Sequence, residues 1–167
     1  MCMSTQAIAV ERKLTKYFRG SDLTSGDPFN IAMRIAVDAD AARIFETLTR
    51  PEYLETWMTL PGDGEDCYLV AWKQRGSFRL DHYRHGRRDV MIRGEYRICR
   101  RQKMLFTWRV SGETAGPETL VYIGLHGNFA STIVELHHRG IPSAAEFSWQ
   151  QEMWSGSLDR LMRLFQR

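Results

Sequence analysis

The sequence is poor in cysteine and proline, and the low cysteine content excludes whole classes of protein. Its 167 residues include five prolines and only three cysteines, Cys2, Cys67 and Cys99. An odd number of widely separated cysteines disfavours both a disulfide framework and a thiolate metal site. We therefore expect reduced thiols, no bound metal and no other cofactor.

Long hydrophobic runs are also missing. No apolar stretch approaches the roughly 20 residues that a membrane-spanning helix needs. The first residues carry Glu11, Arg12, Lys13 and Lys16 and have no apolar segment followed by a small-residue cleavage site, so we expect no secretory signal and a cytoplasmic location. A hydrophobic content of 43% and a charged content of 26% indicate a water-soluble globular chain of one domain.

Sequence motifs of common enzyme sites are absent. The chain contains no G-x-S-x-G elbow, P-loop, G-x-G-x-x-G or H-E-x-x-H. His82, His85 and His126 lie in different strands or turns, at spacings that match no metal motif. The motifs therefore indicate neither a nucleophile nor a metal centre.

The formal charge of +3 is small, but positive charge gathers in one segment. Residues 84–103 hold seven arginines and Lys103 against only Asp89 and Glu95. Such a cluster can attract an anionic partner, or it can be the solvent face of strands that place every second side chain outward. We favour the solvent face and expect no nucleic-acid partner, because interleaved aromatic residues and nucleic-acid motifs are missing.

The N-terminal part divides into an arm and the start of a domain. Residues 1–28 end in a polar cluster with Pro28 and are interpreted as a flexible arm, of which 10–18 can form a short helix, and residues 29–167 form the domain. Alternating apolar residues predict a strand over 29–37. Asp38 and Asp40 offer capping oxygens to a following amphipathic helix, and Pro51 suits the first turn of a second short helix, which is followed by a loop at 61–64.

The middle of the chain predicts six strands joined by short turns, at 67–72, 76–82, 88–100, 103–111, 118–126 and 130–139. Glycines such as Gly86 and Gly112 stand where hairpin reversals are needed, which favours antiparallel meander connections. Beyond Pro142 a broad apolar stripe predicts a long final helix. Neither the stripe nor the apolar sheet face can stay in water cheaply, so we predict an α+β fold in which a curved antiparallel sheet wraps that helix.

Six short motifs occur in the order found in one known family. They are Pro51, Glu52, Tyr53, Leu54 and Trp57; Gly76, Phe78 and Leu80; Gly94, Glu95 and Tyr96; Phe106, Thr107 and Trp108; Thr132 to His138 with Gly140 and Pro142; and Trp154, Leu158 and Leu161. Over roughly residues 29–166 the chain resembles the START-like, or SRPBCC, superfamily, in the branch named for homologues of the activator of the heat-shock-protein ATPase. The resemblance implies the helix-grip fold and a small hydrophobic ligand held between the sheet and the C-terminal helix.

The predicted inner surface is rich in aromatic residues and poor in polar groups. It comprises Trp57, Trp72, Phe78, Leu80, Tyr96, Trp108, Val134, Leu136, His138 and Trp154. Such a lining favours flat apolar ligands, although large aromatic side chains also simply fill cores. His138 should point inward, either as a satisfied structural group, which we favour, or as a ligand-binding or proton-shuttling group.

Three functions fit these observations. The leading hypothesis is a non-enzymatic pocket protein for a small lipid, polyketide or aromatic molecule. The second is an enzyme resembling the superfamily's cyclases and dehydratases, in which His138 or Tyr96 positions a proton. The third is an interaction module for a chaperone, and a homodimer is a further alternative for the partner.

Overall fold

The computed structural model describes residues 29–111 and 116–166. The predicted arm, residues 1–28 with its short helix, lies outside the described residues. The elements, in chain order, are β1 (Ile31–Val37), α2 (Ala41–Thr49), α3 (Pro51–Trp57), β2 (Cys67–Gln74), β3 (Ser77–Arg84), β4 (Arg87–Arg100), β5 (Lys103–Ser111), β6 (Thr119–Gly127), β7 (Thr132–Arg139) and α4 (Ala144–Arg163).

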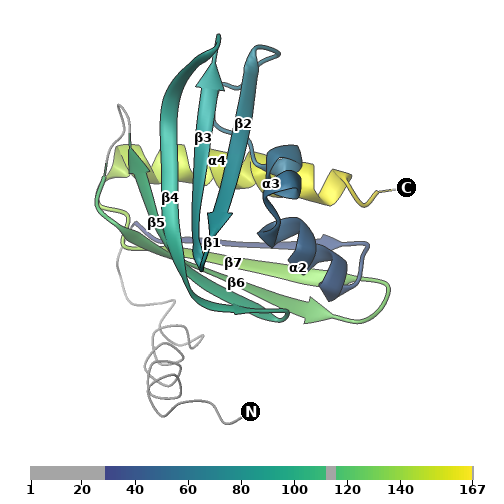
Figure 1. The fold of residues 1–167 in the computed structure, drawn as a ribbon. Coiled ribbons are helices and arrows are strands. Elements are labelled where there is room, and N and C mark those ends of the chain that lie inside the picture. The colour runs from purple at the N-terminus through teal and green to yellow at the C-terminus, as the bar shows by residue number, and fades with distance from the viewer. Residues whose placement is uncertain (1–28, 112–115, 167) are drawn as a thin grey trace.

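Seven strands form one sheet, in the order β1-β7-β6-β5-β4-β3-β2. Every neighbouring pair is antiparallel, and consecutive strands from β2 to β7 pair with each other as a meander. The first strand departs from this pattern, because β1 lies beside β7 at one edge (Figure 1). The antiparallel meander expected from the short glycine-containing turns is confirmed.

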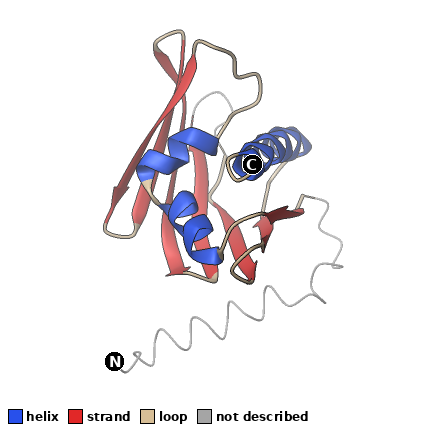
Figure 2. Cartoon of the chain, turned by 90° about the vertical axis from the view of Figure 1, so that its right-hand side faces the viewer, coloured by secondary structure: helices blue, strands red, loops and turns tan. Residues whose placement is uncertain are grey.

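The long helix α4 lies within the curve of the sheet, as the view along the helix shows (Figure 2). Its buried face carries Gln150, Met153, Trp154, Ser157, Leu158 and Leu161. The four apolar side chains of this face join a single core with the inner-facing residues of the strands, α2 and α3. The predicted α+β helix-grip architecture is therefore confirmed. Helix α3 contacts α4 and β2, and α2 contacts α3 and β6.

Local sequence explains where the elements begin. Asp40, and not Asp38, caps α2: its Oδ1 accepts hydrogen bonds from the backbone N–H groups of Ala42 and Arg43 at 2.8 and 2.9 Å. Pro51 occupies the first turn of α3, where its missing N–H costs nothing.

Two-residue turns close the β2–β3 and β3–β4 hairpins, and both residues of each turn have positive φ. The β2–β3 turn consists of Arg75 and Gly76. Gly76, expected at the start of a strand, thus belongs to a turn.

The long strand β4 lies in the interior of the sheet. It pairs with β3 on one side and β5 on the other, and its register with β5 shifts between Tyr96 and Ile98. A side chain at Gly94 would clash with both neighbouring strands, because a Cβ there would fall 1.8 Å from the carbonyl oxygen of Thr107 in β5 and 2.7 Å from the Phe78 ring in β3. The absence of a side chain at this position lets the Phe78 ring lie over the strand.

The arginine-rich segment 84–103 lies mostly on the solvent face of the sheet. Arg88 is within 3.6 Å of Asp81, and Arg97 is within 3.4 Å of Glu95. This distribution agrees with the solvent-face interpretation. Within the described ranges, no helix is long and apolar enough to cross a membrane.

Candidate functional site

A narrow apolar cavity lies between the sheet, α3 and α4. Its walls are formed by Leu48, Leu54, Trp57, Met58, Phe78, Leu80, Tyr96, Met104, Phe106, Trp108, Ile123 and Trp154. The cavity measures about 20 Å³, which is close to the least volume that holds one water molecule. The side chains around it therefore fill most of the space beneath α4.

Aromatic rings pack against each other along one wall of the cavity. The ring centroid of Phe78 lies 5.5 Å from that of Tyr96 and 5.5 Å from that of Phe106. Trp108 lies 5.0 Å from Trp154, which connects strand β5 to α4. Tilted and edge-to-face rings at these separations attract each other beyond their burial. The wall is thus a continuous aromatic surface.

Six of the ten side chains predicted to line the inner surface border this cavity. They are Trp57, Phe78, Leu80, Tyr96, Trp108 and Trp154. Val134, Leu136 and His138 are fully buried, but they lie in β7 and do not border the cavity.

The inward placement of Trp72 was wrong. Its side chain is 59% exposed, and it borders a surface hollow together with Arg79 and Tyr83. In β2 the buried side chains are Leu69 and Ala71, so Trp72 occupies the outer face.

His138 lies at the centre of a hydrogen-bonded chain. The Trp154 indole N–H donates to His138 Nδ1 at 3.0 Å, and His138 Nε2 lies 2.6 Å from Thr119 Oγ1. The Thr119 hydroxyl donates in turn to the Trp108 carbonyl oxygen at 2.9 Å. Because Nδ1 accepts, the proton of the neutral ring sits on Nε2 and points at Thr119. Every hydrogen-bonding atom of the imidazole is therefore engaged.

Burial fixes the charge state of this histidine. His138 is fully buried, and loss of solvation lowers the pKa of its imidazole to about 3. The ring is thus neutral at physiological pH. Burial also raises the pKa of the Tyr96 phenol, with the nearby Cys99 as a smaller cause. Both groups are poorly suited to exchange protons near neutral pH.

Trp108, in the cavity wall, has a buried polar atom whose hydrogen bonding is unsatisfied within the described part of the chain. The residue is 2% exposed, and among the described residues its indole Nε1 has no hydrogen-bond partner. A buried N–H without an acceptor costs free energy, so such groups in native proteins call for an explanation. An acceptor on a bound molecule would supply one.

Comparison with known proteins identifies the family of this chain. Residues 38–166 match the sequence family described as activator of Hsp90 ATPase homolog 1-like protein. The chain belongs to this family. The match covers α2 to α4 and includes all the cavity-lining residues, which agrees with the START-like resemblance of the motifs. No curated protein matches the chain in sequence.

Solved structures share the fold of this family member at low sequence identity. Protein CV1439 from Chromobacterium violaceum has a TM-score of 0.71 and 16% identity, and the alignment covers 84% of this chain and 99% of that one. CalU16 from Micromonospora echinospora has a TM-score of 0.57 and 19% identity, with 81% and 74% covered. DynU16, a protein in the dynemicin biosynthetic locus, has a TM-score of 0.62 and 20% identity, with 81% of this chain and 46% of DynU16 covered. At these identities the likeness establishes the fold alone.

Sequence reasoning missed half of the cavity wall. The missed residues are Leu48, Leu54, Met58, Met104, Phe106 and Ile123. Most had a usable signal: Leu48 and Leu54 lie on the apolar faces of the two short helices, and Phe106 shares the parity of Trp108 in its strand. Met58 follows α3 in a loop, where periodicity gives no direction.

Proposed function

We propose that this family member binds a small, flat, apolar molecule with a hydrogen-bond acceptor between the sheet and α4. The observation that carries the proposal is the buried indole N–H of Trp108, which has no partner among the described residues, in a largely apolar and aromatic wall. Sites for small molecules combine such apolar linings with a few placed polar groups. A ligand carbonyl or phenolic oxygen at this point accepts the bond that the described residues do not.

A ligand must enlarge the cavity before it can bind. Drug-sized ligands occupy roughly 300–1,000 Å³, whereas the cavity measures about 20 Å³. Tyr96 is the natural moving part, because it borders both the cavity and a surface groove formed by residues 74–77 with Glu95. Met58 and Met104 add unbranched, adaptable side chains to the wall. We place the access route beside Tyr96.

The geometry favours binding over acid–base catalysis at His138. Both ring nitrogens are hydrogen-bonded within the protein, and the ring is neutral near pH 7 because its pKa is lowered to about 3. A ligand therefore meets the aromatic wall and the indole N–H of Trp108.

The test is a thermal-shift screen with flavonoids, aromatic polyketides and fatty acids. A ligand at 100 times its Kd stabilises the folded state by about 2.7 kcal/mol. Flavonoids and polyketides should raise the melting temperature more than fatty acids, because only flat ring systems match the wall. A flat response to all three classes would contradict the proposal.

Two tryptophan variants locate the site. Trp108→Phe keeps an aromatic ring but removes the N–H, so a hydrogen-bonding ligand should bind about five-fold more weakly, in keeping with a loss of about 1 kcal/mol. Trp72→Phe is the matched control on the outer face of β2 and should leave the Kd unchanged. Equal losses in both variants would place the ligand elsewhere.

A further inference from the structure

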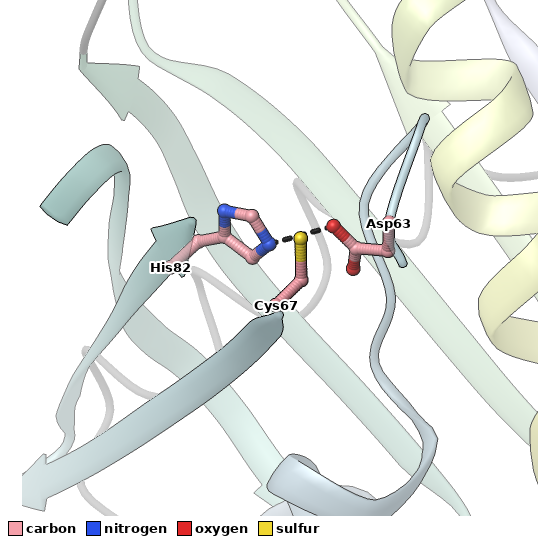
Figure 3. A group of neighbouring side chains, drawn as sticks. All are labelled: Asp63, Cys67 and His82. Atoms are coloured by element: carbon pink, nitrogen blue, oxygen red, sulfur yellow. Dashed lines mark hydrogen bonds and ion pairs between the residues drawn. The ribbon is translucent and has the colours of Figure 1, made fainter. Parts of the chain in front are cut away.

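A second cluster of reactive side chains lies outside the aromatic cavity. Asp63 comes from the loop that follows α3, Cys67 begins β2, and His82 lies in β3. One ligand atom from each residue lies within 4.8 Å of the other two, and the three side chains point toward a common centre (Figure 3). Cys67 and His82 share a sheet face, because Cys67 pairs with Arg84 and His82 pairs with Leu69.

His82 is held between two carboxylates. It is 1% exposed; its Nε2 lies 2.7 Å from Asp63 Oδ1 and its Nδ1 lies 2.5 Å from Asp89 Oδ1. Metal-binding histidines characteristically donate one ring N–H to a carboxylate, which fixes the ring and leaves the other nitrogen for the metal. Asp89 stands in that orienting position, and Nε2 faces Asp63 and Cys67.

Both aspartates are positioned by further bonds. Asp63 Oδ2 accepts hydrogen bonds from the backbone N–H of Leu60 at 2.8 Å and from the hydroxyl of Thr59 at 3.1 Å. Asp63 Oδ1 faces His82 and also lies 3.8 Å from the guanidinium of Arg84. Asp89 Oδ2 accepts a hydrogen bond from Arg84 Nε at 3.0 Å, and the pKa of Asp89 is lowered, since its bonds to His82 and Arg84 outweigh its loss of solvation.

We propose that Asp63 Oδ1, Cys67 Sγ and His82 Nε2 bind a zinc-type divalent metal ion. Zinc takes thiolate, imidazole and carboxylate ligands at about 2.0–2.3 Å in a tetrahedron, with water in the fourth position when the protein supplies three. Sulfur and nitrogen ligands select against Mg²⁺ and Ca²⁺, which require oxygen. Ligand atoms of a zinc tetrahedron are about 3.3–3.8 Å apart, so His82 and Asp63 must separate by about 1 Å.

Two carboxylates and one guanidinium surround the cluster. Asp63 and Asp89 face His82 from its two ring nitrogens, and Arg84 lies 3.0 Å from Asp89 Oδ2 and 3.8 Å from Asp63 Oδ1. Zinc binds the thiolate form of cysteine and an imidazole nitrogen without a proton, so any protons that Cys67 Sγ and His82 Nε2 carry leave to solvent when the metal binds.

The competing interpretation is a purely structural clamp. Hydrogen bonds from His82 to Asp63 and Asp89 attach the loop after α3 to the hairpin of β3 and β4 without any metal. The hydrogen bonds of the clamp do not involve the Cys67 thiol, whereas the zinc site requires the thiol as a ligand. Replacing Cys67 therefore distinguishes the two interpretations. Spacing alone could not suggest the site, because 15 positions separate Cys67 from His82.

Cobalt titration provides the test, because Co²⁺ replaces Zn²⁺ in such sites and reports its ligands by colour. In a Cys2→Ser, Cys99→Ser background, which keeps Cys67 as the one cysteine, one equivalent of Co²⁺ should produce a thiolate charge-transfer band and intense tetrahedral d–d bands. Zn²⁺ should bleach both. Adding Cys67→Ser should abolish the charge-transfer band while circular dichroism stays unchanged.

A second variant guards against a loss caused by misfolding. Asp89 orients His82 and is not a metal ligand in this proposal. Asp89→Asn should therefore weaken Zn²⁺ binding 10- to 100-fold in calorimetry and keep the cobalt absorption bands. Absence of equimolar binding in the folded background protein, or equal Zn²⁺ affinity with and without Cys67, would overturn the proposal and leave the clamp. The site does not depend on the cavity ligand, so the two proposals fail independently.

Discussion

Lowering the pH should destabilise this protein through His138 before most of its carboxylates titrate. An unfolded histidine has a pKa of about 6.5, whereas burial lowers the pKa of His138 in the folded state to about 3. Between these pH values the imidazole of His138 is protonated in the unfolded state and neutral in the folded state. The free energy of unfolding therefore falls as the pH decreases. The contribution is complete above pH 6.5 and declines steadily below it.

The magnitude follows from the width of the titration window. Each pH unit between the two pKa values changes the free energy of unfolding by about 1.36 kcal/mol, so moving from pH 6.5 to 5 should cost about 2 kcal/mol. The pKa values of Asp89 and Glu135 are lowered by their hydrogen bonds to histidines and other neighbours, against the opposing effect of burial. Carboxyl groups with a lowered pKa lose their contribution only as the pH falls below the unfolded values of about 4, outside this window.

Urea unfolding at pH 7, 6 and 5 measures the effect, and His138→Asn is the comparison. The variant loses packing and hydrogen bonds at every pH, but the asparagine does not titrate, so the difference between wild type and variant should shrink by about 2 kcal/mol between pH 7 and 5. If His138→Asn does not fold, His138→Gln takes its place. A difference that stays constant with pH would refute the reasoning.

Three further variants test individual contacts. Gly94→Ala should lower the free energy of unfolding by about 1–3 kcal/mol, because the new Cβ would lie 1.8 Å from the Thr107 carbonyl oxygen. An unchanged free energy of unfolding in denaturant would show that β4 and β5 can move apart to make room for the methyl group. Asp40→Ala should cost about 1 kcal/mol by removing the cap of α2, whereas Asp38→Ala should be nearly neutral, and equal losses would contradict the cap assignment. Trp57→Phe removes the indole bond to the Thr47 carbonyl at 2.9 Å and should lower the melting temperature; an unchanged value would show that the bond contributes nothing.

Most of the fold could be predicted because its periodicities are strong. The alternation of 29–37, the capped helix after Asp40 and the apolar stripe beyond Pro142 each appear in the structure at nearly the expected bounds. Glycine turns limited the connections to antiparallel hairpins. His138 was expected to point inward as a satisfied structural group, and its bonds to Trp154 and Thr119 agree with that.

The misplacement of Trp72 has a specific cause. Strand β2 reads CYLVAWKQ, in which apolar residues occupy both parities, so its sequence does not identify the buried face. Pairing decides it: Ala71 lies opposite Leu80 on the inner face, and Trp72 lies opposite Arg79 on the outer one. Such cross-strand register is a tertiary property that one strand's sequence cannot report.

The size of the cavity and the Asp63, Cys67 and His82 cluster depend on tertiary structure in the same way. A list of aromatic residues indicates a lining, but how completely the rings fill it depends on how they pack. The cluster joins a loop to two strands, and its members match no sequence motif. Side chains from separate elements meet only once the fold is known.

The pairing of the first strand with the last imposes an order on folding. Ile31 of β1 lies opposite His138 of β7 across 107 positions of sequence, and among the residues that the structure describes β7 is the only strand that pairs with β1. During synthesis from the N-terminus, β1 cannot form its hydrogen bonds to β7 until almost the whole domain has left the ribosome. Closing so distant a contact is slow, and truncation before Thr132 would leave an unpaired apolar strand prone to aggregation.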